Sequence, residues 1–298
     1  MSLETVKELL AHRPAHGPTM PGRRRAWEEI GERLYGPAER HGGIDAASFG
    51  LPPGLIVGPG VITTDRPLLI WYHGGAFCLG SSRSYVGFAK ALSQRGGFQV
   101  YVPDYPLAPE HVYPAPFEGA FDAYAAVLRA GWAADRVALG GDSAGGTLTL
   151  ATALRARDRG LPAPRALVPL SPSSDMTGAT VATTANAATD IFLSVEGLAA
   201  GRQVLSPGRE DFSDPGLSPI HADLHGLSDT FVLVGGAEIL LEDALLLVER
   251  LRAAGVRCDL EVAPGMPHIY SYFHPVLPEA EPSVGNIARF LSDRFSGP

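Results

Sequence analysis

The chain has 298 residues, and its 35 Gly and 26 Pro lie well above ordinary usage. Because 45% of the residues are hydrophobic and only 19% are charged, the composition excludes a disordered chain and indicates a turn-rich globular fold. The formal net charge of −8 leaves no basic surface that could neutralise phosphates, so nucleic acid is excluded as an expected partner. The basic cluster Arg23–Arg25 is predicted to be a solvated helix start.

Cysteine usage and hydropathy bear on the compartment. Cys78 and Cys258 cannot build a disulfide scaffold, and a reducing compartment is the simplest interpretation. Charged residues near the N-terminus argue against a signal peptide, and no run reaches the roughly 18 apolar residues of a membrane helix. We therefore expect a cytoplasmic location and no membrane span.

The apolar pattern predicts helices first and an alternating α/β pattern afterwards. Two amphipathic helices are predicted within residues 2–40, broken by Pro14–Gly22. Beyond them, short apolar runs alternate with helical stretches, which is typical of βαβ units and a mostly parallel sheet. The predicted strands are Leu55–Val57, Leu68–Tyr72, Gln99–Val102, Arg136–Leu139, Ala166–Leu170, Thr230–Val234 and Cys258–Val262. The predicted helices are Tyr85–Gln94, Phe117–Ala130, Ala144–Arg159, Glu242–Ala254 and Val284–Phe290.

The alternation stops between Ser171 and about Gly216, where the pattern predicts one helical stretch near Val195–Val204. So long an interval between two strands usually belongs to a lid or a binding element. No internal repeat or flexible linker is evident. We therefore predict a single α/β domain over residues 1–298, with a helical cap from residues 1–45 and 171–216.

A candidate nucleophile follows the fourth predicted strand. The segment Gly141–Gly145 contains G-x-S-x-G between a strand and a helix, the context of a nucleophile elbow that exposes Ser143 on a strained turn. Gly141 and Gly145 leave room where a Cβ would collide with neighbouring backbone. A plain packing turn and a phosphate loop are the alternatives, but neither G-K-[ST] nor G-x-G-x-x-G is present here.

Candidate oxyanion donors follow the second predicted strand, in His73-Gly74-Gly75-Ala76. Successive glycines let backbone N–H groups approach the negatively charged oxygen of a tetrahedral intermediate. Lipases and esterases carry H-G-G-G at such a loop, and Ala76 replaces the third glycine. We expect the Ala76 donor to survive only if that residue has an ordinary backbone conformation, because alanine disfavours positive φ.

A serine nucleophile needs a base, and nine histidines compete. The chain order of nucleophile, acid and histidine typical of such elbows favours His268, in the loop after the last predicted strand, over its competitor His274.

Three acids follow the strand Thr230–Val234. Glu242 and Asp243 lie where a helix begins and can be explained by the helix dipole, whereas Glu238 lies in the loop and is free to turn towards a histidine. Glu238 is therefore the predicted acid, with Asp243 in reserve.

Several of these motifs together resemble the hormone-sensitive-lipase-like family of α/β-hydrolase esterases, over about residues 67–292. The matching blocks are His73–Ala76, Tyr105–His111 (Y-R-L-A-P-E-H in the family, with Pro106 for Arg), Gly141–Gly146 and Pro264–His268. The resemblance implies an α/β-hydrolase fold with a cap, oxyanion donors from the amides of Gly75, Ala76 and Ala144, and a loop shaped by Gly74. The family's acid is usually Asp, but similar bacterial acetyl-hydrolases also read A-E-x-L-L.

These observations predict a serine carboxylester hydrolase that acts on small or medium acyl esters through Ser143, His268 and Glu238. Acyl transfer, lactone chemistry or acetate elimination by the same residues is one alternative. A non-catalytic binding protein is another, since plant gibberellin receptors resemble this family and lack the histidine. We predict no cofactor and no metal, a small-molecule ester as partner, and leave a homodimer open. Aromatic candidates for an acyl pocket, with plain core packing as the alternative, are Phe77, Tyr72, Phe192, Phe212 and Tyr270.

Overall fold

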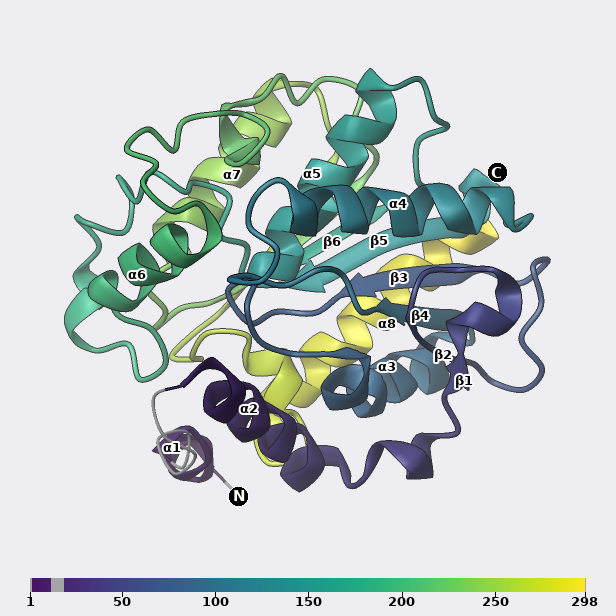
Figure 1. Cartoon of the computed structure of the whole chain (residues 1–298), viewed down its shortest axis with the longest axis horizontal. Coiled ribbons are helices and arrows are strands. Elements are labelled where there is room, and N and C mark those ends of the chain that lie inside the picture. Colours follow the sequence, from purple (N-terminus) through teal and green to yellow (C-terminus); the bar gives the residue numbers. More distant parts are fainter. Residues whose placement is uncertain (1, 12–18, 298) are drawn as a thin grey trace.

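The computed structural model describes residues 2–11 and 19–297, and its centre is a single twisted sheet (Figure 1). The eight strands in the described part of the chain have the order β1-β2-β4-β3-β5-β6-β7-β8. The pairs β1–β2 and β2–β4 are antiparallel, and all other pairs are parallel. The strands are β1 (Ile44–Asp45), β2 (Gly54–Val57), β3 (Leu68–Tyr72), β4 (Gln99–Pro103), β5 (Val137–Asp142), β6 (Leu167–Leu170), β7 (Thr230–Gly235) and β8 (Cys258–Ala263).

Helices cover both faces of the sheet. The helices α4, α5 and α7 pack on one face, and α3 and α8 pack on the other, with α1 and α2 outside them (Figure 1). Their bounds are α1 (Leu3–Ala11), α2 (Met20–Tyr35), α3 (Ser82–Gly96), α4 (Ala115–Arg129), α5 (Ala144–Asp158), α6 (Val195–Leu205), α7 (Leu241–Ala253) and α8 (Glu281–Ser296).

The central strands are apolar because both of their faces are covered. Every residue of β3, β4, β5, β6 and β7 is buried, as expected for parallel strands between two helical layers. The predicted α/β class and mostly parallel sheet are therefore confirmed. The strand β1 is absent from the prediction, because its two residues are exposed and carry no apolar run.

The second helix begins earlier than the sequence predicts. Thr19 accepts a hydrogen bond from the Gly22 amide and caps α2, so Gly22 lies inside the helix rather than in the break. Most of the predicted break, residues 12–18, lies outside the described residues.

The prediction of a solvated basic cluster is wrong for one of its three residues. Arg23 and Arg25 are exposed, whereas Arg24 donates to Cys78 O at 2.9 Å, to Ala108 O at 3.0 Å and to both carboxylate oxygens of Glu110. Arg24 thus joins α2 to the loops after β3 and β4.

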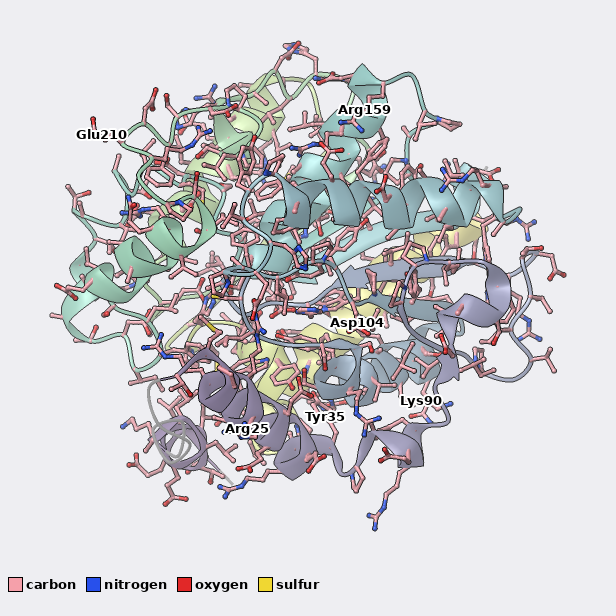
Figure 2. All side chains as sticks on the ribbon, viewed as in Figure 1. Arg25, Tyr35, Lys90, Asp104, Arg159 and Glu210 are labelled. Atoms are coloured by element: carbon pink, nitrogen blue, oxygen red, sulfur yellow. The ribbon has the colours of Figure 1, made fainter. Side chains whose placement is uncertain are left out.

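Arg25, Arg159 and Glu210 are among the charged side chains that lie on the outside (Figure 2). Within residues 2–11 and 19–297, no helix is long and apolar enough to cross a membrane. In the same ranges, no group of three or more His, Cys, Asp or Glu side chains could hold a metal ion. Both cysteines are free and buried.

Candidate active site

Ser143 lies on a sharp turn between β5 and α5. Its backbone has φ 54° and ψ −120°, a conformation that costs free energy for any residue with a Cβ and is concentrated at functional sites. The Ser143 amide donates to Leu170 O of β6 at 2.8 Å, which ties the turn to the sheet. The residue stays partly exposed although its neighbours Asp142 and Ala144 are buried.

The flanking glycines have the steric role predicted for them. A Cβ on Gly141 would overlap the carbonyl oxygen of Gly145, and a Cβ on Gly145 would overlap the carbonyl oxygen of Tyr72. The turn can therefore pack against β3 only with glycine at both positions. The helix α5 begins at Ala144, so its free N–H groups and positive end lie next to the Ser143 hydroxyl.

His268 lines the cavity into which Ser143 opens, and Glu238 lies next to His268. His268 lies in the loop after β8 and is 1% exposed, and Glu238 follows β7 and is fully buried. His268 Nδ1 and Glu238 Oε2 are 3.5 Å apart. Hydrogen bonds of catalytic groups are often long in the absence of substrate, so this separation suits an acid that orients an imidazole.

The rival acids have other surroundings. Asp243 is buried, and its carboxylate accepts hydrogen bonds from the Ser174 hydroxyl and, at 3.0 Å, from the Asp175 amide. Burial raises the pKa of Asp243 to about 7. Glu242 is exposed on α7.

The rival base is also placed elsewhere. His274 Nδ1 lies 2.9 Å from Glu281 Oε2 at the start of α8, and its ring lies between Tyr35 and Phe88. His274 therefore belongs to the packing between α2, α3 and α8.

Ser171 is a site residue that sequence reasoning missed. Its hydroxyl donates to Glu238 Oε2 at 2.8 Å and accepts the Ile269 amide at 3.2 Å, so it joins the acid to the histidine loop. Both Ser171 and Ile269 have positive φ, 45° and 48°. The available signal was position: Ser171 directly follows β6, and the carboxyl ends of parallel strands meet at one edge of the sheet.

The loop after β3 presents unpaired backbone donors. Among the residues that the structure describes, the amides of Gly75, Ala76 and Ala144 donate no hydrogen bond, and all three residues line the cavity with Ser143. The Gly74 amide is engaged, because it donates to Tyr85 Oη and Asp142 Oδ1, each at 3.2 Å. This arrangement suits the predicted division between a shaping residue, Gly74, and three donors.

Ala76 does not have the ordinary backbone conformation that the sequence analysis required of an oxyanion donor. Ala76 has φ 52° and Phe77 has φ 61°, so neither residue adopts an ordinary conformation. The Ala76 amide is nevertheless unpaired. The reason is geometric: its N–H lies in the peptide plane shared with Gly75, and rotation about φ of Ala76 does not turn that plane.

Asp142 supports this loop from behind the nucleophile. Its carboxylate accepts from Trp71 Nε1 at 3.0 Å and Tyr85 Oη at 2.7 Å, besides the Gly74 amide. Burial raises the pKa of Asp142 to about 6. A Cβ on Gly74 would overlap Asp142 Oδ2, so the close approach of loop and carboxylate requires glycine there.

We expect Gly75→Ala to damage the loop and Ala76→Gly to spare it. Gly75 has φ 114°, and a Cβ there would overlap Leu79 O, so the loop must shift and misplace its donors. Loss of one oxyanion donor costs about 10²–10³-fold in kcat, which assays of a p-nitrophenyl ester would detect. Ala76→Gly relieves a left-handed alanine and should keep wild-type kcat.

Gly255→Ala is the matched control, since Gly255 has φ 74° but a Cβ added there would meet no atom within 4 Å. It should lower thermal stability by about 1 kcal/mol and leave kcat unchanged. Equal kcat for Gly75→Ala and Gly255→Ala would contradict the role given to the loop.

The cavity at Ser143 has a volume of about 260 Å³. Its wall combines Trp27 of α2, the loop after β3, His268 and residues of α6, and α2 and α6 lie on the same side of the molecule (Figure 1). We propose that α1, α2 and residues 171–216 form the cap predicted above, with its N-terminal part ending before β1.

Two of the five predicted acyl-pocket aromatics line this cavity. Phe77 and Phe192 are in the wall, and the Phe192 ring packs edge-on against His268 with centroids 5.2 Å apart. Tyr72 and Tyr270 instead turn their hydroxyls to Ala120 O and Glu261, and Phe212 is buried outside the wall. These three side chains are therefore packed in the core, which was the alternative to a place in the acyl pocket.

A mostly parallel eight-stranded sheet with a serine on the turn after β5 defines the α/β-hydrolase class. A family model described as alpha/beta hydrolase fold matches residues 69–272. The chain is 36% identical to an esterase of Acinetobacter venetianus over 225 residues, 76% of this chain and 74% of that protein. It is 35% identical to an acetyl-hydrolase of Streptomyces hygroscopicus over 252 residues, 82% of this chain and 84% of that protein.

Solved structures of similar proteins are also esterases or lipases. A bacterial esterase from the hormone-sensitive lipase family matches with a TM-score of 0.86 and 33% identity, covering 99% of this chain and 98% of that one. A hormone-sensitive lipase from a metagenome library matches with a TM-score of 0.89 and 30% identity, covering 99% of each chain. The chain belongs to the α/β-hydrolase fold family and, within it, to the hormone-sensitive lipase family of esterases. It is an enzyme of the carboxylesterase type.

Proposed function

We propose that the chain hydrolyses small or medium acyl esters with Ser143 as nucleophile, His268 as general base and Glu238 as the acid that orients His268. The observation that carries the proposal is the pairing of a strained serine turn with a buried His268–Glu238 pair around one cavity.

The reaction proceeds in two stages. The Ser143 hydroxyl attacks the ester carbonyl while His268 takes its proton through Nε2, because Nδ1 is the nitrogen that faces Glu238. The protonated His268 then gives the proton to the leaving alcohol, which leaves an acyl group on Ser143. Water, activated by His268 in the same way, attacks this acyl-enzyme and releases the acid.

The three unpaired amides supply electrostatic stabilisation. Negative charge that develops on the carbonyl oxygen is bound by N–H groups of Gly75, Ala76 and Ala144, which are fixed before the reaction begins. The positive end of α5 acts in the same sense.

Labelling by a fluorophosphonate probe tests the proposal. The probe should attach covalently to Ser143 alone, as located by mass spectrometry of peptides, and should abolish hydrolysis of p-nitrophenyl butyrate. An unlabelled Ser143 would favour the non-catalytic binding alternative. If the probe labels Ser143 but the unlabelled enzyme releases no free acid from an ester when an acceptor alcohol is present, acyl transfer is favoured.

A cytoplasmic location and a homodimer stay predictions from the sequence.

A further inference from the structure

One cationic side chain lines the cavity that holds Ser143. The cavity wall is largely apolar, with Val181, Phe192 and Leu198 among its residues. Besides His268, its titratable side chains are Arg202 of α6 and Asp175 of the segment after β6. Placing a charged group such as Arg202 in an apolar wall costs free energy, because the group is partly removed from water.

The Arg202 guanidinium is held in place by its surroundings. It lies against the backbone of Gly178, where an added Cβ would overlap Nη1, and its Cζ is 5.9 Å from the centre of the Phe212 ring. The side chain is half-buried. These contacts restrict the guanidinium before any ligand enters, which lowers the entropic cost of binding.

The donors of this guanidinium are unused by the protein. In the ranges that the structure describes, the Arg202 side chain forms no hydrogen bond and no salt bridge, although a guanidinium carries five N–H donors. Burial lowers the pKa of Arg202, and the charge of Asp175 partly offsets that effect.

Asp175 does not accept a hydrogen bond from Arg202. Its Oδ1 accepts from the Thr177 amide at 2.9 Å and the Thr177 hydroxyl at 2.6 Å, and lies 3.3 Å from His221 Nε2. Only 5% of the residue is exposed. Asp175 is thus occupied by its own neighbours, and the donors of Arg202 remain available to a ligand.

We propose that Arg202 binds a carboxylate of the substrate, so that the enzyme prefers esters that carry a free carboxylate separated from the ester by an apolar spacer. This inference rests on the proposed function, because it assigns the substrate class of the same cavity. A cavity of about 260 Å³ holds one small molecule, so the carboxylate at Arg202 and the ester at Ser143 belong to one ligand. A planar guanidinium pairs best with a carboxylate, through two parallel hydrogen bonds.

The carboxylate can belong to the acyl part or to the alcohol part of the ester, and two pairs of substrates separate these sources. For the acyl part, 4-nitrophenyl hydrogen adipate is compared with the neutral 4-nitrophenyl ester of adipic acid monoamide. For the alcohol part, 6-acetoxyhexanoate is compared with 6-acetoxyhexanamide in a pH-stat. Within each pair, length is matched and only the charge differs.

The wild-type enzyme should prefer the carboxylate member of at least one pair in kcat/KM. Arg202→Gln should lower kcat/KM for that member by about 10- to 100-fold, mainly through KM, because a hydrogen bond to a charged group is lost. The neutral member should be unaffected. The kcat/KM of Arg202→Lys for the carboxylate member should lie between those of the wild type and Arg202→Gln, since lysine keeps the charge but cannot form two parallel hydrogen bonds.

Arg209→Gln is the matched control: Arg209 is also half-buried, but it pairs with Asp214 and lies outside the cavity wall. It should leave both members of each pair at wild-type values. The proposal is overturned if the wild-type enzyme prefers neither carboxylate, or if Arg202→Gln lowers both members equally, as a purely structural arginine would.

A binding measurement separates failure of this inference from failure of the proposed function. Calorimetric titration of Ser143→Ala with adipate should show binding that Ser143→Ala/Arg202→Gln lacks, whether or not esters are cleaved. Hydrolysis of the neutral esters without adipate binding overturns the inference and leaves the function intact. Adipate binding in a chain that cleaves no ester supports the carboxylate site and contradicts the proposed hydrolysis.

Discussion

Ser143→Ala should lower kcat for a p-nitrophenyl ester by about 10⁶-fold, the size of effect that loss of a catalytic serine has in other serine hydrolases. The hydroxyl is the atom that forms the acyl-enzyme, and no other side chain on the turn after β5 carries a nucleophile. Residual rate above the uncatalysed reaction would come from the oxyanion donors and from substrate binding, both of which the variant retains.

The variant should fold like the wild type. Alanine and serine differ by one oxygen, both pay a similar cost for a positive φ of 54°, and the Ser143 amide keeps its bond to Leu170 O. Ser93→Ala is the matched control, since Ser93 is a fully buried serine on α3, away from the cavity. Its kcat should equal that of the wild type. A Ser143→Ala enzyme with wild-type turnover would show that the nucleophile lies elsewhere.

The central fold was predictable because apolar runs report burial directly. Leu68–Tyr72 was predicted with its observed bounds, since a parallel strand covered on both faces has a continuous apolar pattern. The helix α3 begins at Ser82, before the predicted Tyr85, because its first turn is set by the Ser81 cap rather than by apolar spacing. Capping serines and short exposed strands such as β1 lie outside what periodicity can reveal.

The site was predictable where a motif fixes the backbone, and less so where contacts are long-range. Ser143 and the two elbow glycines follow from a five-residue motif whose steric demands arise where the turn packs against β3. The left-handed Ala76 does not, since alanine itself disfavours positive φ and the loop after β3 is bonded to distant segments, as Cys78 O is to Arg24. Ser171 and Arg202 were missed for a related reason: the groups that surround each of them lie on other segments, and neither residue is part of a recognisable pattern.

Glu238→Gln and Asp243→Asn should affect different properties, the first kcat and the second stability. Glu238→Gln keeps the side chain's size and leaves an oxygen for the Ser171 hydroxyl and the Gly235 amide, but it removes the charge 3.5 Å from His268 Nδ1. Without that charge, the positive charge that His268 gains in the transition state is no longer stabilised. Loss of the orienting acid in this way costs about 10⁴-fold in kcat, measurable with a p-nitrophenyl ester across the pH range.

Asp243→Asn should spare kcat and change stability. The wild-type carboxylate has a pKa of about 7, above the ordinary value of 3.8, because it is buried. A carboxyl whose pKa is raised on folding stabilises the protein fully below pH 3.8, and this contribution declines as the pH rises towards 7. Thermal unfolding of the wild type should therefore lose stability across that window relative to Asp243→Asn. If instead Asp243→Asn abolishes turnover while Glu238→Gln retains it, the acid is Asp243, and the buried Glu238–Ser171–Ile269 connection serves only to hold the histidine loop.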